Sequence, residues 1–562
     1  MRKFGRRALC LMIITICVLT LTIPGWAAPE EAMEGELEGG LYWKLEEDTL
    51  TISGEGAMLD IPYPWHSYWS DHWQQLRSSI KYVVVEPGVT VISPSAFSEL
   101  QFLARVSLPE GLQTISTNAF FGCVNLTSIN IPSTVTEIGA GAFYKCSRLQ
   151  SIVIPAGVTK IEAHTFYQCN GLTDVTLPEG IVSIGEQAFA ECHFLKNIQL
   201  PASVHTIGLS AFSQCGWIEE ITIPDGVTRI EPHTFSGCSK LSSVTLPEQL
   251  TWIGSDAFRG CKKLAQIQLP QGLNTIDSSA FQECESLTQI TLPQGLQVIS
   301  GSAFASTGLV KIVVPDSVTR LGNGAFYGCT ELIEVSLPQN LTVIESDAFA
   351  ECTKLPAITI PASVQRIGGN AFSRCISLRR VDISDLNAWL GIWFEHSSSN
   401  PLFLGGQLYL NGTPLTELVV PEGITDINAY AFIGCKNLES ITLPERLERI
   451  GPGAFDSCDN LSSATLPASL RNIGERAFNR CNRLKIIHYS GTYEQLQNIW
   501  VGTGNDVLTT ASWQLSPENM ADLSIPAAKA AAVMMLVQLV FNLAAVIVCF
   551  ILEHRRRTNF LL

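Results

Sequence analysis

A phenylalanine recurs every 23 residues along most of this chain, and this period constrains the fold more than any other feature. Ten copies run from Phe97 to Phe304 without a break, three more follow a one-residue deletion, and the last three lie between Phe432 and Phe478. The unit reads L-x-x-I-x-L-P-x-G-V-x-x-I-G-x-x-A-F-x-x-C, as in residues 126–146. A repeat of this length indicates a solenoid, in which each unit buries its apolar face against its neighbours.

Each part of the unit predicts a local structure. Apolar and polar residues alternate over residues 126–131, which predicts a short, half-buried strand that Pro132 closes. The stretch 135–139 predicts a second short extended segment. The Ala-Phe-x-x-Cys sequence at residues 142–146 predicts a single helical turn, because that spacing places Phe and Cys on one helix face.

Fourteen cysteines share one position of the repeat. Cysteines one coil apart would lie about 4.8 Å from each other with parallel side chains, whereas a disulfide needs Cβ atoms about 3.8 Å apart. Thr307 and Leu100 take the same position, and no Cys-x-x-Cys or histidine pattern suggests zinc. We therefore expect buried, unpaired structural thiols, with pairing of some as the alternative. The residues are Cys123, Cys146, Cys169, Cys192, Cys215, Cys238, Cys261, Cys284, Cys329, Cys352, Cys375, Cys435, Cys458 and Cys481.

The two ends of the chain resemble targeting segments. Residues 1–27 combine a positive start, an apolar run and small residues, as in a cleaved secretory signal, although an uncleaved anchor is the alternative. Residues 527–552 are apolar enough to predict a transmembrane helix, and the three arginines that follow place residues 553–562 in the cytoplasm. Gln538 and Asn542 lie four residues apart and are candidates for weak self-association of this helix.

Composition and motifs exclude several function classes. The net charge is −16 and no basic stripe is present, so we expect no nucleic-acid partner. The sequence contains no nucleophile elbow, P-loop or dinucleotide glycine motif. We therefore expect no enzyme activity, no cofactor and no metal site.

The repeat resembles a known family. The pieces L-x-x-I-x-L-P and I-P-x-x-V-T-x-I-G-x-x-A-F-x-x-C are similar to the BspA-type leucine-rich repeat, from about Tyr82 to Tyr489. Residues 41–58, 400–425 and 489–508 resemble the lead-in, insertion and closing segments of that family. The resemblance implies a leucine-rich repeat solenoid with a parallel β-sheet on the concave face and short helical or 3-10 turns outside. It also implies a surface protein of bacteria that adheres to host or envelope components.

Together these patterns predict one solenoid followed by a C-terminal transmembrane helix. The expected segments are a signal peptide (1–27), a lead-in and cap (28–80), repeats (81–380), an insertion (381–417), further repeats (418–489), a cap and linker (490–526), the transmembrane helix (527–552) and a cytoplasmic tail (553–562).

Two groups of side chains are candidate binding sites. The first is a row of polar residues that points outward from the concave strands, with strand propensity on a wet sheet as the alternative explanation. It comprises Asn130, Thr176, Gln199, Thr222, Thr245, Gln268, Thr291, Ser336 and Thr359. The second is an aromatic patch that could stack on sugar rings or instead cap the first coil. It comprises Trp65, Tyr68, Trp69 and Trp73.

These observations favour a membrane-anchored, non-catalytic protein that binds an extracellular protein or glycan at the bacterial surface. The alternative function is an envelope scaffold that organises other membrane proteins.

Overall fold

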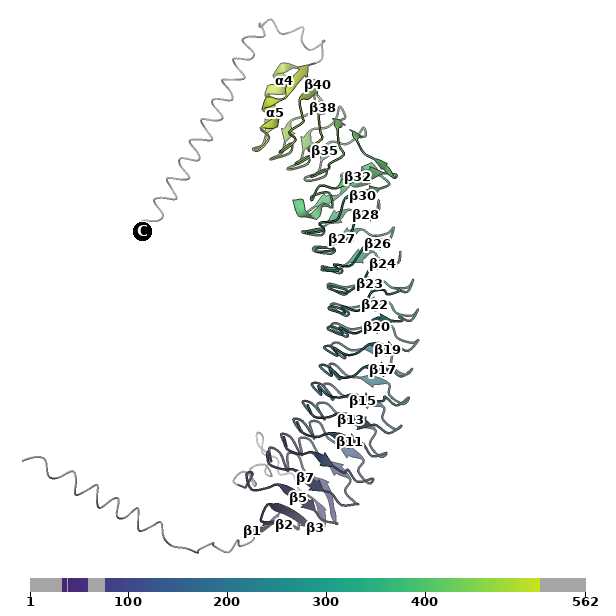
Figure 1. Ribbon diagram of the computed structural model, residues 1–562, viewed down its shortest axis with the longest axis vertical. Coiled ribbons are helices and arrows are strands. Elements are labelled where there is room, and N and C mark those ends of the chain that lie inside the picture. The colour runs from purple at the N-terminus through teal and green to yellow at the C-terminus, as the bar shows by residue number, and fades with distance from the viewer. Residues whose placement is uncertain (1–32, 38, 59–75, 516–562) are drawn as a thin grey trace, which may run out of the picture. The chain divides into compact units, whose positions relative to one another are not determined.

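The computed structural model describes residues 33–37, 39–58 and 76–515 (Figure 1). The chain divides into two compact units, each described here by itself. Unit 1 comprises the residues up to 363 together with 370–377, and unit 2 comprises 364–369 together with the residues from 378 onward. The expected signal peptide, transmembrane helix and cytoplasmic tail lie outside the described residues.

Unit 1 begins with a three-stranded antiparallel meander. Strand β1 (Met33–Leu37) pairs with β2 (Leu41–Glu46), and β2 pairs with β3 (Thr49–Gly54). Strand β3 then pairs in parallel with β5 (Tyr82–Val85), the first strand of the repeats. The meander therefore continues the repeat sheet and covers its first edge.

Nearly every coil of unit 1 contributes two very short strands, and the strands pair in parallel with their counterparts in neighbouring coils (Figure 1). The coil that contains Thr291 contributes only the second of them. The first series follows β5 with β7 (Arg105–Ser107), β9 (Ser128–Ile129), β11 (Ser151–Val153), β13 (Asp174–Thr176), β15 (Asn197–Ile198), β17 (Glu220–Thr222), β19 (Ser243–Thr245), β21 (Gln266–Ile267), β24 (Lys311–Val313), β26 (Glu334–Ser336) and β28 (Ala357–Thr359). The second series is β4 (Gly56–Ala57), β6 (Val89–Ile92), β8 (Thr114–Ile115), β10 (Glu137–Ile138), β12 (Lys160–Ile161), β14 (Ser183–Ile184), β16 (Thr206–Ile207), β18 (Arg229–Ile230), β20 (Trp252–Ile253), β22 (Thr275–Ile276), β23 (Val298–Ile299), β25 (Arg320–Leu321) and β27 (Val343–Ile344).

The third side of each coil is a run of turns, which corrects the expected helical or 3-10 turn. In the coil around Phe120, the flanking residues Asn118 and Gly122 have left-handed backbones, with φ of 57° and 71°. A helical turn requires consecutive right-handed residues, so these two positions break it. Alternate amides instead point along the stack, and the amide of Phe120 donates to the carbonyl of Ala142 in the next coil at 2.8 Å.

The core is a set of parallel columns of identical side chains. The repeat phenylalanines are buried, and successive rings stack with centroids 5.3 to 5.7 Å apart, as between Phe189 and Phe212 at 5.4 Å. Leucine, isoleucine and alanine columns fill the rest of the interior. Each ring therefore loses its contact with water only because a neighbouring coil covers it.

Unit 2 starts with irregular coils that contain the insertion. It contains β29 (Arg366–Ile367), β30 (Arg380–Ile383), helix α3 (Leu386–Gly391), β31 (Trp393–Phe394), the 3-10 helix η1 (Ser397–Ser399), β32 (Gln407–Leu410) and β33 (Thr413–Pro414). Asp385 caps α3 by accepting amide hydrogens from Asn387 and Ala388. The buried Trp389 donates its indole hydrogen to the carbonyl of Ala431 at 3.1 Å, which fixes the insertion on the coil that follows.

Regular coils resume after the insertion and end in a different cap. The strands are β34 (Glu417–Val419), β35 (Asp426–Ile427), β36 (Ser440–Thr442), β37 (Arg449–Ile450), β38 (Ser463–Leu466), β39 (Asn472–Ile473), β40 (Ile486–Tyr489), β41 (Trp500–Val501) and β42 (Ser512–Leu515), with helices α4 (Tyr493–Gln497) and α5 (Val507–Thr510) between the last of them. In the cap, the buried side chain of Asn505 accepts the amide hydrogen of Phe478 at 2.9 Å.

The expected fold class is wrong in its transmembrane helix. Within residues 33–37, 39–58 and 76–515 there is no helix of the length and apolar character that a membrane crossing requires, and the segment 527–552 lies beyond them. The helices described are short, with six residues in α3, five in α4 and four in α5. The corrected fold class is a leucine-rich repeat β-solenoid with little helix.

Candidate functional site

One polar residue per coil, at the end of the first-series strand or at the equivalent position, forms an exposed row, here called the strand row. Strand pairing places Val153 beside Thr176 and Thr222 beside Thr245. All nine residues expected from the sequence are exposed, and Val153 and Val313 lie in the same row with 63% and 64% of their surface exposed. The row therefore offers small, uncharged side chains at the spacing of adjacent strands, about 4.8 Å.

Charged and amide residues lie two positions before the strand row and pair along the stack. The Asn197 amide donates to Asp174 at 2.6 Å. Thr173 also donates to Asp174 at 2.6 Å, and these two hydrogen bonds, with the Thr173 bond the stronger influence, lower the pKa of the Asp174 carboxyl. Lys311 forms an ion pair with Glu334 at 2.6 Å. The strand row is thus a neutral strip beside groups that partly satisfy one another.

The fourteen repeat cysteines are buried, and none of them forms a disulfide. Thirteen donate the thiol hydrogen to the carbonyl of the repeat phenylalanine in the preceding coil, at 3.0 to 3.3 Å. Cys435 follows the insertion and lies 3.2 Å from the side-chain oxygen of Asn437 instead. Thr307 replaces a cysteine and donates to Phe304 of its own coil at 2.9 Å.

Burial makes these thiols poor nucleophiles. It raises the pKa of Cys238 and Cys375 to about 12, and that of Cys329 and Cys435 to about 11. Since the thiolate is the reactive form, a thiol with such a pKa is inert near neutral pH. Among the residues that the structure describes, no group of three or more His, Cys, Asp or Glu side chains could hold a metal ion.

Two of the expected sites lie outside the described residues. They are the aromatic patch of Trp65, Tyr68, Trp69 and Trp73 and the helix-association pair of Gln538 and Asn542. Both stay predictions.

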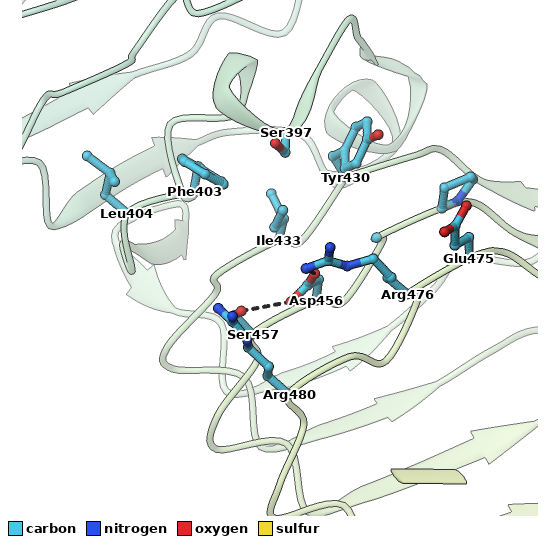
Figure 2. A pocket seen from close by; sticks show the side chains of 12 residues that line it. Ser397, Phe403, Leu404, Tyr430, Ile433, Asp456, Ser457, Glu475, Arg476 and Arg480 are labelled. Atoms are coloured by element: carbon cyan, nitrogen blue, oxygen red, sulfur yellow. Dashed lines mark hydrogen bonds and ion pairs between the residues drawn. The ribbon is translucent and has the colours of Figure 1, made fainter. Parts of the chain in front are cut away.

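Unit 2 contains a hollow that the sequence did not suggest, here called the arginine hollow (Figure 2). It has a volume of about 560 Å³. Phe403 and Leu404 of the insertion line one side, and Arg476 and Arg480 of the last regular coil line another. No sequence signal marks it, because its walls come from segments about 75 residues apart that meet only when the insertion packs on the coils.

Comparison with known proteins identifies the repeat. Residues 75–178, 159–284, 206–333, 320–394 and 405–501 match the family described as BspA type leucine rich repeat region. A solved leucine-rich repeat protein from Bacteroides ovatus is 26% identical, with 87% of this chain and 98% of that chain covered and a TM-score of 0.46. A leucine rich cell surface protein from Faecalibacterium prausnitzii is 22% identical, with coverages of 84% and 98% and a TM-score of 0.30.

No curated protein matches the sequence. The family match nevertheless covers more than half of the chain and includes nearly all of its coils. The chain therefore belongs to the BspA-type leucine-rich repeat family, a family of bacterial cell-surface proteins.

Proposed function

We propose that this protein is a non-catalytic binding protein of the bacterial surface, and that it engages an extended protein or glycan along the strand row. The observation that carries the proposal is the exposure of one uncharged side chain per coil at equivalent positions, which strand pairing aligns at Val153 and Thr176, at Thr222 and Thr245, and at Val313 and Ser336. Such a strip matches a partner that repeats along its own length, because each coil adds one equivalent contact.

The composition of the row favours many weak contacts over one tight site. Tight interfaces depend on buried tryptophan, tyrosine and arginine anchors, and the strand row consists of Thr, Gln, Asn, Ser and Val. Weak contacts that share one rigid support add their effects through local concentration. We therefore expect affinity to rise steeply with the length of the partner.

The buried thiols support a non-catalytic role. Cysteine is the strongest nucleophile among the side chains that repeat, and its pKa is raised in every coil where a shift is resolved. Their position and bonding serve the stacking of coils.

The test compares two pairs of substitutions in the same two coils. Thr222→Glu with Thr245→Glu places two charges in the strand row, whereas Thr228→Glu with Thr251→Glu places the same charges on exposed positions outside it. Binding of the purified full chain to a glycan array and to immobilised envelope proteins is measured for both. We expect about tenfold or greater loss only for the first pair, since buried unpaired charge opposes contact. Equal loss for both pairs would reject the strand row as the site.

A further inference from the structure

We propose that the arginine hollow of unit 2 is a second binding site, and that it takes an acidic saccharide. This inference is independent of the strand row, which lies on a different unit and contributes no side chain to the hollow. Its volume of about 560 Å³ falls within the range of about 300–1,000 Å³ that is usual for small-molecule sites.

A glycine in one coil sets the position of an aromatic side chain that lines the hollow. Tyr430, Gly453 and Arg476 occupy the same turn position in three successive coils, with left-handed φ of 64°, 59° and 57°. A Cβ atom on Gly453 would lie 2.9 Å from the ring of Tyr430, so a larger residue could not stand there without displacing that ring. The ring of Tyr430 therefore lies directly against the backbone of Gly453, and both residues line the hollow.

One of the two arginines is already held by the protein. The buried carboxylate of Asp456 accepts hydrogen bonds from Ser457 at 2.8 Å and Asn479 at 3.0 Å, and it forms an ion pair with Arg476 at 3.3 Å. Figure 2 shows Asp456 among the side chains that line the hollow, with the Ser457 hydroxyl directed toward it. Asp456 thus fixes the position of Arg476. Its negative charge is compensated by Arg476 and by the two hydrogen bonds that it accepts.

The second arginine is available. Arg480 is exposed, and its guanidinium makes no ion pair or hydrogen bond within the part of the chain that the structure describes. A guanidinium binds a carboxylate through two parallel N–H···O bonds, which gives both strength and orientation. Arg480 therefore favours a ligand whose charged end is an oxyanion with two oxygens that accept both bonds, and a carboxylate is such a group.

The remaining lining matches a sugar ring. Phe403 and Leu404 each expose 40% of their surface, and Tyr430 lines another part of the hollow. These side chains offer apolar surface on which the face of a ring can pack. Ser397 and Glu475 add a hydroxyl and a carboxylate that can bond to sugar hydroxyls. A sugar ring has an apolar face and a polar edge, so a uronic acid satisfies the arginine, the aromatic wall and the hydroxyls together. A short acidic peptide would satisfy only the arginine.

The experiment is titration calorimetry of the full chain with digalacturonic acid and with the same disaccharide after reduction of its carboxyl groups. We expect binding of the acid and at least tenfold weaker binding of the reduced form. Arg480→Gln should weaken binding of the acid by about tenfold or more. The matched control is Arg446→Gln, which removes an equal charge from an exposed position outside the hollow and should leave binding unchanged.

A steric variant tests the same site without changing charge. The backbone of Gly453→Asn should be tolerated, because Asn118 and Asn370 adopt the same left-handed turn position in other coils. Its side chain should displace the ring of Tyr430, which lines the hollow, and should therefore abolish binding. Circular dichroism and the melting temperature establish that each variant is folded.

Three results would overturn the proposal. They are the absence of measurable binding of digalacturonic acid at millimolar concentration, equal binding of the acidic and reduced disaccharides, and equally tight, Arg480-dependent binding of N-acetyl-Asp-Asp. Thr222→Glu with Thr245→Glu should bind the disaccharide normally, so failure here and failure of the strand row remain distinguishable.

Discussion

Cys146 donates its thiol hydrogen to the carbonyl oxygen of Phe120 in the preceding coil at 3.3 Å. The same oxygen accepts the amide hydrogen of Cys123 at 3.2 Å. One buried carbonyl is therefore shared by cysteines of two successive coils, and its two lone pairs are both used. This arrangement explains why the position favours a small side chain that is also a donor.

Replacing one of these cysteines should show how much a buried thiol and its hydrogen bond contribute to the free energy of unfolding. We expect Cys215→Ala to lower the free energy of unfolding by about 1–2 kcal/mol, because it deletes a buried atom and leaves the Phe189 carbonyl with one partner fewer. Urea unfolding followed by circular dichroism provides the measurement. Glu219→Ala, an exposed change in the same coil, should stay within about 0.5 kcal/mol of the native protein. Equal effects of the two substitutions would contradict this account.

The raised pKa of the thiols predicts a loss of stability at high pH. Burial raises the pKa of Cys238 to about 12, whereas an unfolded cysteine titrates near about 8.5. Above that pH the unfolded chain binds fewer protons than the folded chain, so the free energy of unfolding falls as pH rises. Below it these thiols contribute no pH dependence.

The measurement is the urea midpoint at several pH values between about 7 and about 10. Cys238 should contribute a loss of about 2 kcal/mol by pH 10, and Cys238→Ala should remove that contribution. A native protein and a Cys238→Ala variant with parallel pH profiles would show that this thiol ionises equally in both states.

The left-handed turn positions predict which residues a coil accepts. Gln187 has φ of 52° and donates its amide to Leu209 of the next coil at 2.9 Å. We expect Gln187→Val to cost about 1–2 kcal/mol, because a β-branched side chain clashes with the backbone in this conformation. Gln187→Asn should be nearly neutral, since asparagine tolerates it. The measurement is the thermal unfolding of the two variants. If Gln187→Val were as stable as the native protein, the turn would have to relax to accept a β-branched residue.

The phenylalanine column should dominate the stability of unit 1. Phe212 stacks on Phe189 at 5.4 Å and on Phe235 at 5.6 Å, and it is fully buried. Phe212→Ala should lower the free energy of unfolding by about 3–5 kcal/mol, as large cavities do. Phe102 exposes 51% of its surface, so Phe102→Ala is the matched control and should cost far less. The measurement is denaturant unfolding of both variants. A loss for Phe102→Ala as large as that for Phe212→Ala would contradict the prediction.

The period of the sequence was sufficient to predict the coils, the buried phenylalanines and the solenoid. It did not predict the turns on the third side, because Gln187, His164 and Lys145 occupy left-handed positions that carry no glycine signal. Ala-Phe-x-x-Cys has the spacing of a helix, but hydrogen bonds between coils outweigh that local preference. The arginine hollow was also beyond prediction, since Phe403 and Arg480 are brought together only by the packing of the insertion.

The amide of Phe478 donates its hydrogen to the side chain of Asn505 and not to the backbone of a further coil. The two ends of the solenoid therefore differ in how their backbone hydrogen bonds are completed. Alternate amides of the turn segment donate toward the C-terminal neighbour, as Phe120 does to Ala142, so a stack that stopped after a regular coil would leave these donors unmet. Such an edge could recruit another chain head to tail and grow into a fibre. Asn505 supplies an acceptor that belongs to no strand, and it therefore satisfies one amide that a further coil would otherwise have met.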